Sequence, residues 1–195
     1  MTCKNKFLLY IFLLYNISME TTKNELSPYS KIFFSKLSNY LDTKIYYFGS
    51  IQRNDYFPKS SDIDIDIFTN NEKSTMLKLQ NYLNIKKSDI HKFVYKLTKN
   101  NRIVHGYKVK YNDEINNFST EILVFNEIHK NDVLYEHNSK NILPFYISYL
   151  LILLKYTYYN LNLITSKNYI NLKRKLLNGV YEKSNINFVV IESLR

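Results

Sequence analysis

Several residue types that define common protein classes are rare in this chain of 195 residues, which has one cysteine, three glycines, three prolines and no tryptophan. A single cysteine, Cys3, excludes an intramolecular disulfide framework and a cysteine-based zinc site. It fits a reducing compartment, so we expect a cytoplasmic protein. The chain contains no Gly-rich loop of the P-loop type, no G-x-S-x-G elbow and no candidate cysteine nucleophile. The four histidines lack the spacing of metal ligands.

The bulk composition is that of a folded protein with a basic surface. Hydrophobic residues make up 45% of the chain and charged residues 23%, values that are ordinary for one globular domain. The formal net charge of +10 suits a phosphate-bearing partner. The lysines are scattered, however, and a solvated basic surface explains them equally well. The 19 tyrosines and 12 phenylalanines are better explained by AT-rich coding than by a nucleic-acid platform.

Two apolar stretches raise the question of a membrane. The first, Phe7–Tyr15, lies in an apolar N-terminal extension of residues 1–18 and is too short for a comfortable span. This extension reads either as a mistaken start before Met19 or as a weak anchor. The second, Ile142–Ile164, is interrupted by Lys155, and the length of its apolar part favours a packed helix with Pro144 in its first turn. A membrane-associated protein remains the less favoured alternative.

The order of elements predicts an α+β fold with a mixed β-sheet flanked by helices. Ser27 and Pro28 have the pattern of an N-cap followed by N1, and the helix after them places Ile32, Phe33, Leu37 and Leu41 on one face. Strands are expected at 44–50, 62–68, 91–97, 102–111 and 119–126, with a helix at 75–85. We expect a core of residues 19–135 and a C-terminal helical segment of residues 136–195.

Three aspartates alternate with isoleucines in one expected strand. Asp62, Asp64 and Asp66 therefore share a face of that strand, while the isoleucines between them face the other side. Like charges at this spacing repel unless something positive lies beside them. An exposed amphipathic strand also explains the alternation, but the preceding strand ends in Gly49 and Ser50, which suit close approach of phosphate oxygens. Carboxylates opposite a phosphate site favour Mg²⁺ as the bridging cation.

These residues resemble the signature of the DNA polymerase beta-type nucleotidyltransferase superfamily. The sequence "FGS" ending at Ser50 is followed, after eleven residues, by "DID" at Asp62 to Asp64, and the resemblance covers about Tyr46–Phe125. It implies a nucleotidyltransferase core with a third carboxylate on a later strand, and Glu121 in "STEILVF" is the match. Thr120 departs from the large aliphatic residue that the pattern has before this acid. Asp66 is an additional acid, which leaves Asp64 and Asp66 as an alternative to the preferred pair.

The resemblance implies transfer of a nucleoside monophosphate from an NTP, ATP among them, to an acceptor hydroxyl. Asp62, Asp64 and Glu121 would hold two Mg²⁺ or Mn²⁺ ions and carry the catalysis. The triphosphate would be bound by Gly49, Ser50 and Arg53. The acceptor can be an RNA, a protein or a small molecule, and the oligomeric state is open. The competing hypothesis is a catalytically inactive module of the same fold that binds a nucleotide or a partner.

Overall fold

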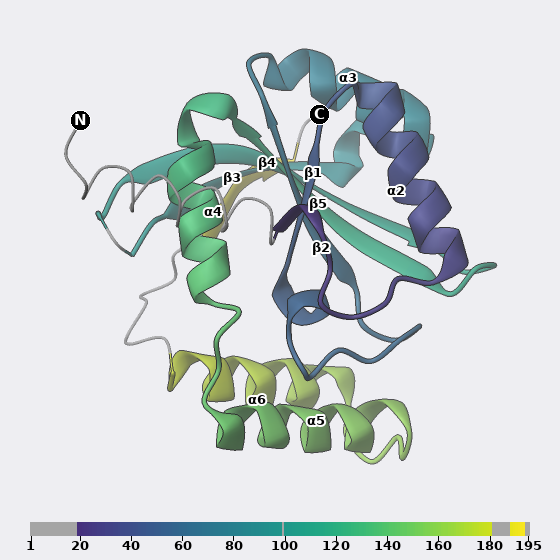
Figure 1. Ribbon diagram of the computed structural model, residues 1–195, viewed down its shortest axis with the longest axis vertical. Coiled ribbons are helices and arrows are strands. Elements are labelled where there is room, and N and C mark those ends of the chain that lie inside the picture. Colours follow the sequence, from purple (N-terminus) through teal and green to yellow (C-terminus); the bar gives the residue numbers. More distant parts are fainter. Residues whose placement is uncertain (1–18, 99, 181–187, 194–195) are drawn as a thin grey trace, which may run out of the picture.

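A six-stranded mixed sheet forms the centre of the computed structural model, which describes residues 19–98, 100–180 and 188–193 (Figure 1). In spatial order the strands are β1 (Ile45–Phe48), β2 (Ile63–Thr69), β5 (Phe118–Asn126), β4 (Ile103–Asp113), β3 (Ile90–Lys96) and β6 (Phe188–Ser193). β2 and β5 are parallel, and the other neighbouring strands are antiparallel. The α+β class and the mixed sheet expected from the sequence are confirmed.

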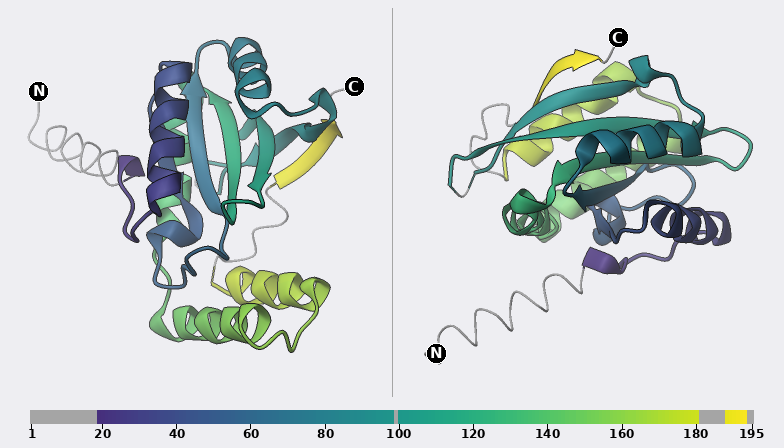
Figure 2. Two further views of the ribbon diagram at one scale, coloured as in Figure 1. Left: turned by 90° about the vertical axis from the view of Figure 1, so that its right-hand side faces the viewer. Right: turned by 90° about the horizontal axis from the view of Figure 1, so that it is seen from above.

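Helices cover both faces of the sheet and one of its ends. The helices α2 (Pro28–Leu41) and α3 (Glu72–Leu83) pack on one face, and α4 (Lys130–Ser139) packs on the other. The helices α5 (Phe145–Tyr159) and α6 (Ser166–Asn178) form a hairpin beyond one end of the strands, as Figure 1 and the left view of Figure 2 show. The chain therefore places a helical pair beside the loops that leave this end of the sheet.

The first helix begins as the sequence predicts. The Oγ of Ser27 accepts a hydrogen bond from the backbone N–H of Ser30 at 3.1 Å, and Pro28 occupies the first turn, where it loses no helical hydrogen bond. The prediction is wrong for one residue of the expected inner face, because Ile32 is 56% exposed. Phe34 is buried in its place, because the helix turns its 33–34 edge toward the sheet.

The alternating strand β2 separates two environments. Ile63, Ile65 and Ile67 are buried in the core between the sheet and the helices α2 and α3. The aspartates face the opposite side of the sheet, where β5 runs parallel to β2 with Asp64 beside Glu121. The strand thus contributes a hydrophobic face to the core and an acidic face to the side of α4 and the hairpin.

The C-terminal part of the chain differs from the expectation in two ways. It is not helical throughout, because β6 pairs with β3 at the edge of the sheet. The apolar stretch 142–164 is not a fully packed helix either, since α5 buries only Ile147, Leu151 and Lys155 and leaves Phe145 86% exposed. Within the described ranges, no helix combines the length and apolar character needed to cross a membrane. The expected extension of residues 1–18 lies outside those ranges.

Candidate active site

The turn after β1 brings the backbone of Gly49 close to the carboxylate of Asp64. Gly49 has a φ of 73°, a left-handed conformation that favours glycine, and it starts the 3₁₀ helix Gly49–Gln52. A Cβ atom at this position would lie 2.1 Å from Oδ2 of Asp64. Glycine is therefore required both by the backbone conformation and by the close approach. Ser50 follows it and is almost fully buried.

Three carboxylates are contributed by β2, by the residue that directly precedes it, and by the adjacent strand β5. Asp62 directly precedes β2, Asp64 lies within it, and Glu121 is the neighbour of Asp64 across the β2–β5 pairing. Two lysines of β4 face this group: Nζ of Lys110 lies 3.0 Å from Oδ2 of Asp62, and Nζ of Lys108 lies 2.5 Å from Oε2 of Glu121. The positive charge that the three acids require is thus present in the protein itself.

The two aspartates of this group have opposite electrostatic environments. Burial alone would raise the pKa of Asp62, but hydrogen bonds from Ser119 and Lys110 outweigh it and lower the pKa. Asp64 retains some exposure, yet desolvation, reinforced by the nearby charges of Glu121 and Asp62, raises its pKa to about 7. Folding therefore favours the neutral form of Asp64 and the ionised form of Asp62.

The additional acid of the strand lies in the interior. Asp66 is fully buried, and its Oδ2 lies 2.6 Å from Nδ1 of His137 in α4. It does not line the cleft described below, so the Asp64–Asp66 alternative has no support in the geometry. Thr120, the departure from the family pattern, is buried as well. Its hydroxyl donates to the carbonyl oxygen of Ile63 at 2.7 Å and so ties β5 to β2 beside the acids.

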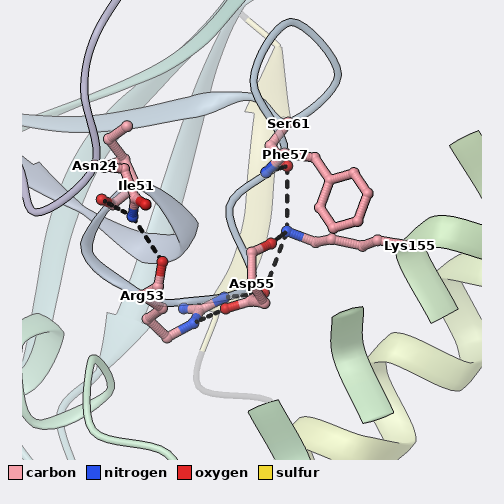
Figure 3. A network of polar contacts seen from close by, with 7 residues as sticks. All are labelled: Asn24, Ile51, Arg53, Asp55, Phe57, Ser61 and Lys155. Atoms are coloured by element: carbon pink, nitrogen blue, oxygen red, sulfur yellow. Dashed lines mark hydrogen bonds and ion pairs between the residues drawn. The ribbon is translucent and has the colours of Figure 1, made fainter. Parts of the chain in front are cut away.

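A buried polar network fixes the loop between the turn and β2 to the helical hairpin (Figure 3). Asp55 accepts from Nε of Arg53 at 2.8 Å and from Nη2 at 3.2 Å. Lys155 of α5 donates to the Asp55 backbone oxygen at 2.5 Å and to Oγ of Ser61 at 3.2 Å, and its Nζ lies 3.2 Å from Oδ2 of Asp55. Burial lowers the pKa of Lys155 to about 8, although Asp55 opposes that shift. Arg53 is therefore held in an ion pair at the edge of the cleft.

These groups surround one cleft between the sheet and the hairpin, with a volume of about 590 Å³. This volume is within the range of small-molecule sites. The residues that line it include the turn, the three acids, four cations and three tyrosines: Gly49, Ser50, Asp62, Asp64, Glu121, Arg53, Lys110, Lys155, Lys173, Tyr158, Tyr159 and Tyr169. The structure thus brings all six candidate site residues of the sequence to one place.

The carboxylates suit a hard cation in donor type, and burial, together with the charges of Glu121 and Asp62, raises the pKa of Asp64. In the part of the chain that the structure describes, however, no three acidic, histidine or cysteine side chains are close enough to hold a metal ion. Two of the acids are directed to lysines instead. A cation binding here competes with the ammonium groups of Lys108 and Lys110.

Sequence reasoning missed several residues that line the cleft or pair with its acids. Lys108 and Lys110 repeat the two-residue spacing of the aspartates on another strand, a pattern that could have been recognised. Lys155 is the one charge within an apolar helix, and such a charge is often functional or paired. Tyr158 and Tyr169, whose rings stack at 4.3 Å, carry no local signal because tyrosine is abundant throughout the chain.

Comparison with known proteins identifies the family of the chain. The model of the nucleotidyltransferase domain family matches residues 30–143, more than half of the chain, and the protein belongs to this family. The polymerase beta-type resemblance is therefore confirmed. No curated protein matches the chain. A solved structure described as the GLD-2/RNP-8 complex is similar at 14% identity and a TM-score of 0.29, over 97% of this chain and 74% of that one.

Proposed function

We propose that the protein transfers a nucleoside monophosphate from an NTP to a hydroxyl group of an acceptor. The observation that carries this proposal is the cleft in which the Gly49–Ser50 turn faces three carboxylates among four cations. Gly49 allows phosphate oxygens to approach the backbone, and Ser50 beside it lines the same cleft with a hydroxyl that can bind them. Lys155 and Lys173 lie on the hairpin side of the same cleft and attract the triphosphate. The half-buried side chains of Tyr158 and Tyr159 line the cleft beside these lysines and would contact the base.

Asp62, Asp64 and Glu121 are the residues that would hold two Mg²⁺ or Mn²⁺ ions, which when bound stabilise charge on the entering and leaving oxygens. In the reaction the acceptor oxygen bonds to the α-phosphorus while the bond from that phosphorus to the bridging β-phosphate oxygen breaks. Pyrophosphate leaves with that oxygen, and Glu121 takes the proton of the acceptor hydroxyl. Arg53 is positioned by Asp55 at the edge of the cleft, where its charge favours bound phosphates.

A test uses the purified protein with each α-labelled NTP, Mg²⁺ or Mn²⁺, and RNA, protein or small-molecule acceptors. We expect labelled product from the unsubstituted protein and none from Asp64→Asn. The matched control is Asp132→Asn, because Asp132 is a surface acid of α4 that pairs with Arg102 outside the cleft. Product that persists in Asp64→Asn would contradict the assignment of this site.

A second candidate, a nucleotide-binding module without turnover, is favoured by one observation, the pairing of Asp62 and Glu121 with lysines. Calorimetry with a nonhydrolysable NTP and Mn²⁺ separates the two. Tight binding without transfer to any acceptor supports the inactive module. Failure to bind any NTP rejects both candidates.

A further inference from the structure

The helix α5 has an unusual distribution of polar and apolar side chains. It buries Ile147, Leu151 and Lys155, which recur at intervals of four residues and mark the side of the helix that faces the core. Lys155 is the only charged residue of α5, and it points inward, where it donates to the backbone oxygen of Asp55 and to Oγ of Ser61. A surface helix of a globular domain normally turns its apolar side inward and its charges toward water. The side of α5 that faces away from the core therefore contains no charge.

The outward side of α5 is apolar and aromatic. It carries a stripe of four side chains, Phe145, Tyr149, Leu153 and Tyr156, which repeat at helical spacing on the opposite side from the buried positions. Each of the four is at least 47% exposed. More than half of the large hydrophobic side chains that the described residues leave exposed lie within residues 142–172. Such a concentration marks a surface that contacts another molecule, because the exposed apolar residues of a monomeric protein are normally scattered.

The neighbouring helix adds charge of a single sign. Between Glu136 and Glu182 the sequence has six lysines and arginines and no aspartate or glutamate. Lys167, Arg174 and Lys175 of α6 are exposed, and α6 packs along α5 in the hairpin (Figure 1). Protein surfaces normally intersperse both signs of charge. The hairpin therefore presents an apolar stripe with a purely cationic flank.

The charge of the hairpin decides between the molecules that could cover the stripe. A second copy of the chain would bring two cationic hairpins together, and like charges repel. Residues 1–18 of the same chain are no better suited, since they contain Lys4 and Lys6 and no acid. An anionic surface attracts the cations while the apolar side chains leave water. Tyrosine, which supplies two of the four stripe residues, is enriched where a membrane meets water, because its ring is apolar and its hydroxyl is polar.

We propose that the outer side of the α5–α6 hairpin binds a membrane surface rich in anionic lipid. The 15 residues of α5 are fewer than the about 20 that a span requires, so the helix lies in the interface, with its stripe at the boundary of headgroups and acyl chains. Lys167, Arg174 and Lys175 contact the lipid phosphates. The inner side of the same hairpin lines the cleft with Lys155 and Lys173. Membrane binding therefore uses none of the candidate site residues and is independent of nucleotidyl transfer.

Vesicle flotation of the full chain tests this surface. Vesicles of phosphatidylcholine with about 30% phosphatidylserine should carry the protein to the top of a density gradient. Vesicles of phosphatidylcholine alone should bind it at least about tenfold more weakly, because a neutral surface does not attract the three cations. Flotation separates binding from aggregation, since aggregated protein stays at the bottom. Equal binding to the two kinds of vesicle, or binding to neither, would overturn the proposal.

A double variant tests the apolar stripe. Phe145→Ser combined with Tyr149→Ser should weaken binding to the anionic vesicles at least about tenfold, because two large side chains no longer leave water. Both residues are exposed, so the fold should tolerate the change. The matched control is Ile115→Ser, since Ile115 is 93% exposed and lies in the turn between β4 and β5, outside the hairpin. This control should bind the vesicles as the unsubstituted protein does.

A second double variant tests the cations. Arg174→Gln combined with Lys175→Gln should weaken binding to the anionic vesicles about 20- to 30-fold, which is about fivefold for each charge. The matched control is Lys73→Gln combined with Lys78→Gln, which removes the same charge from two exposed lysines of α3 at the other end of the molecule (Figure 1). The control should stay within about twofold of the unsubstituted protein, because salt screens charges that far from the lipid.

Other occupants of the stripe give different results, each of which would overturn the proposal. Vesicle binding that both hairpin double variants leave unchanged would place the lipid contact outside the hairpin. A stable dimer in light scattering, without flotation, would assign the stripe to a second copy if Phe145→Ser with Tyr149→Ser abolishes it. Binding of polyglutamate without flotation would assign the surface to an acidic protein partner.

The membrane surface and the proposed function fail separately. Asp64→Asn should float as the unsubstituted protein does, because Asp64 lies in the cleft and not on the outer side of the hairpin. Flotation without transfer to any acceptor rejects the enzyme and keeps the membrane surface. Transfer without flotation keeps the enzyme and rejects the membrane surface.

Discussion

Asp55 and Lys155 allow a quantitative test of the buried network behind the cleft. Asp55→Ala removes the carboxylate that Arg53 and Lys155 share and leaves two buried cations without it. Removal of one partner from a buried ion pair typically costs about 3–5 kcal/mol. Domains of this kind unfold with a free energy of about 5–15 kcal/mol, so Asp55→Ala should lose a large part of its stability.

Lys155→Met should have a very different effect. Burial lowers the pKa of Lys155 from 10.5 to about 8, a shift that corresponds to a penalty of about 3 kcal/mol for the charged form in the folded protein. Methionine fills a similar space without that penalty, and Asp55 keeps its ion pair with Arg53. We therefore expect the free energy of unfolding at pH 7 to change by less than about 1 kcal/mol, or to increase.

The titration of Lys155 makes the free energy of unfolding rise with pH. The unfolded chain keeps the Lys155 proton up to its pKa near 10.5, whereas the folded protein releases it near 8, so the stability of the folded state rises with pH between these values. Relative to Lys155→Met, the unsubstituted protein should gain about 2 kcal/mol between pH 7 and pH 9.5. Taking the difference cancels the titration of the tyrosines.

Urea titrations followed by circular dichroism, at pH 7 and pH 9.5, measure the free energy of unfolding. The three proteins compared are the unsubstituted protein, Asp55→Ala and Lys155→Met. The reasoning is refuted if Lys155→Met loses as much stability at pH 7 as Asp55→Ala. It is also refuted if the difference between the unsubstituted protein and Lys155→Met does not grow with pH.

Three further predictions concern the cleft. Gly49→Ala should lower the free energy of unfolding by about 1–3 kcal/mol and abolish transfer, since its φ is 73° and its Cβ would meet Asp64. Thermal denaturation and the transfer assay check this against Gly179→Ala, which should be tolerated because the nearest atoms to its Cβ lie at 3.6 Å. The pKa of Asp64 rises from 3.8 to about 7 on folding, so stability should fall as pH increases across that interval. Asp64→Asn should remove most of that slope in denaturant titrations at pH 5 and pH 8. Lys110→Gln should change the free energy of unfolding by less than about 1 kcal/mol, because the ion pair with Asp62 is largely exposed. Calorimetry should show Mn²⁺ binding that is several-fold tighter, since an ammonium group no longer competes with the ion.

Local patterns were sufficient for the framework of the site. Period-two alternation in β2 assigns its isoleucines to the core and its aspartates to one face, because side chains alternate along any strand. The cap at Ser27 is equally local, since it depends on a hydrogen bond within one helical turn. Gly49 and Ser50 mark the turn for the same reason.

What the sequence determined by itself was therefore the α+β class, the family motif and the candidate residues that line the cleft. Only the tertiary structure decided the partners of those residues. Asp66 meets a histidine 71 positions away, and Asp55 meets a lysine 100 positions away. Strand register and helix placement, set by packing of the whole core, bring such groups together, and short-range periodicity contains no information about either. For the same reason the sequence alone wrongly predicts an inward-facing Ile32 and a helix at the position of β6: the surface that each segment meets is formed by residues distant in the chain.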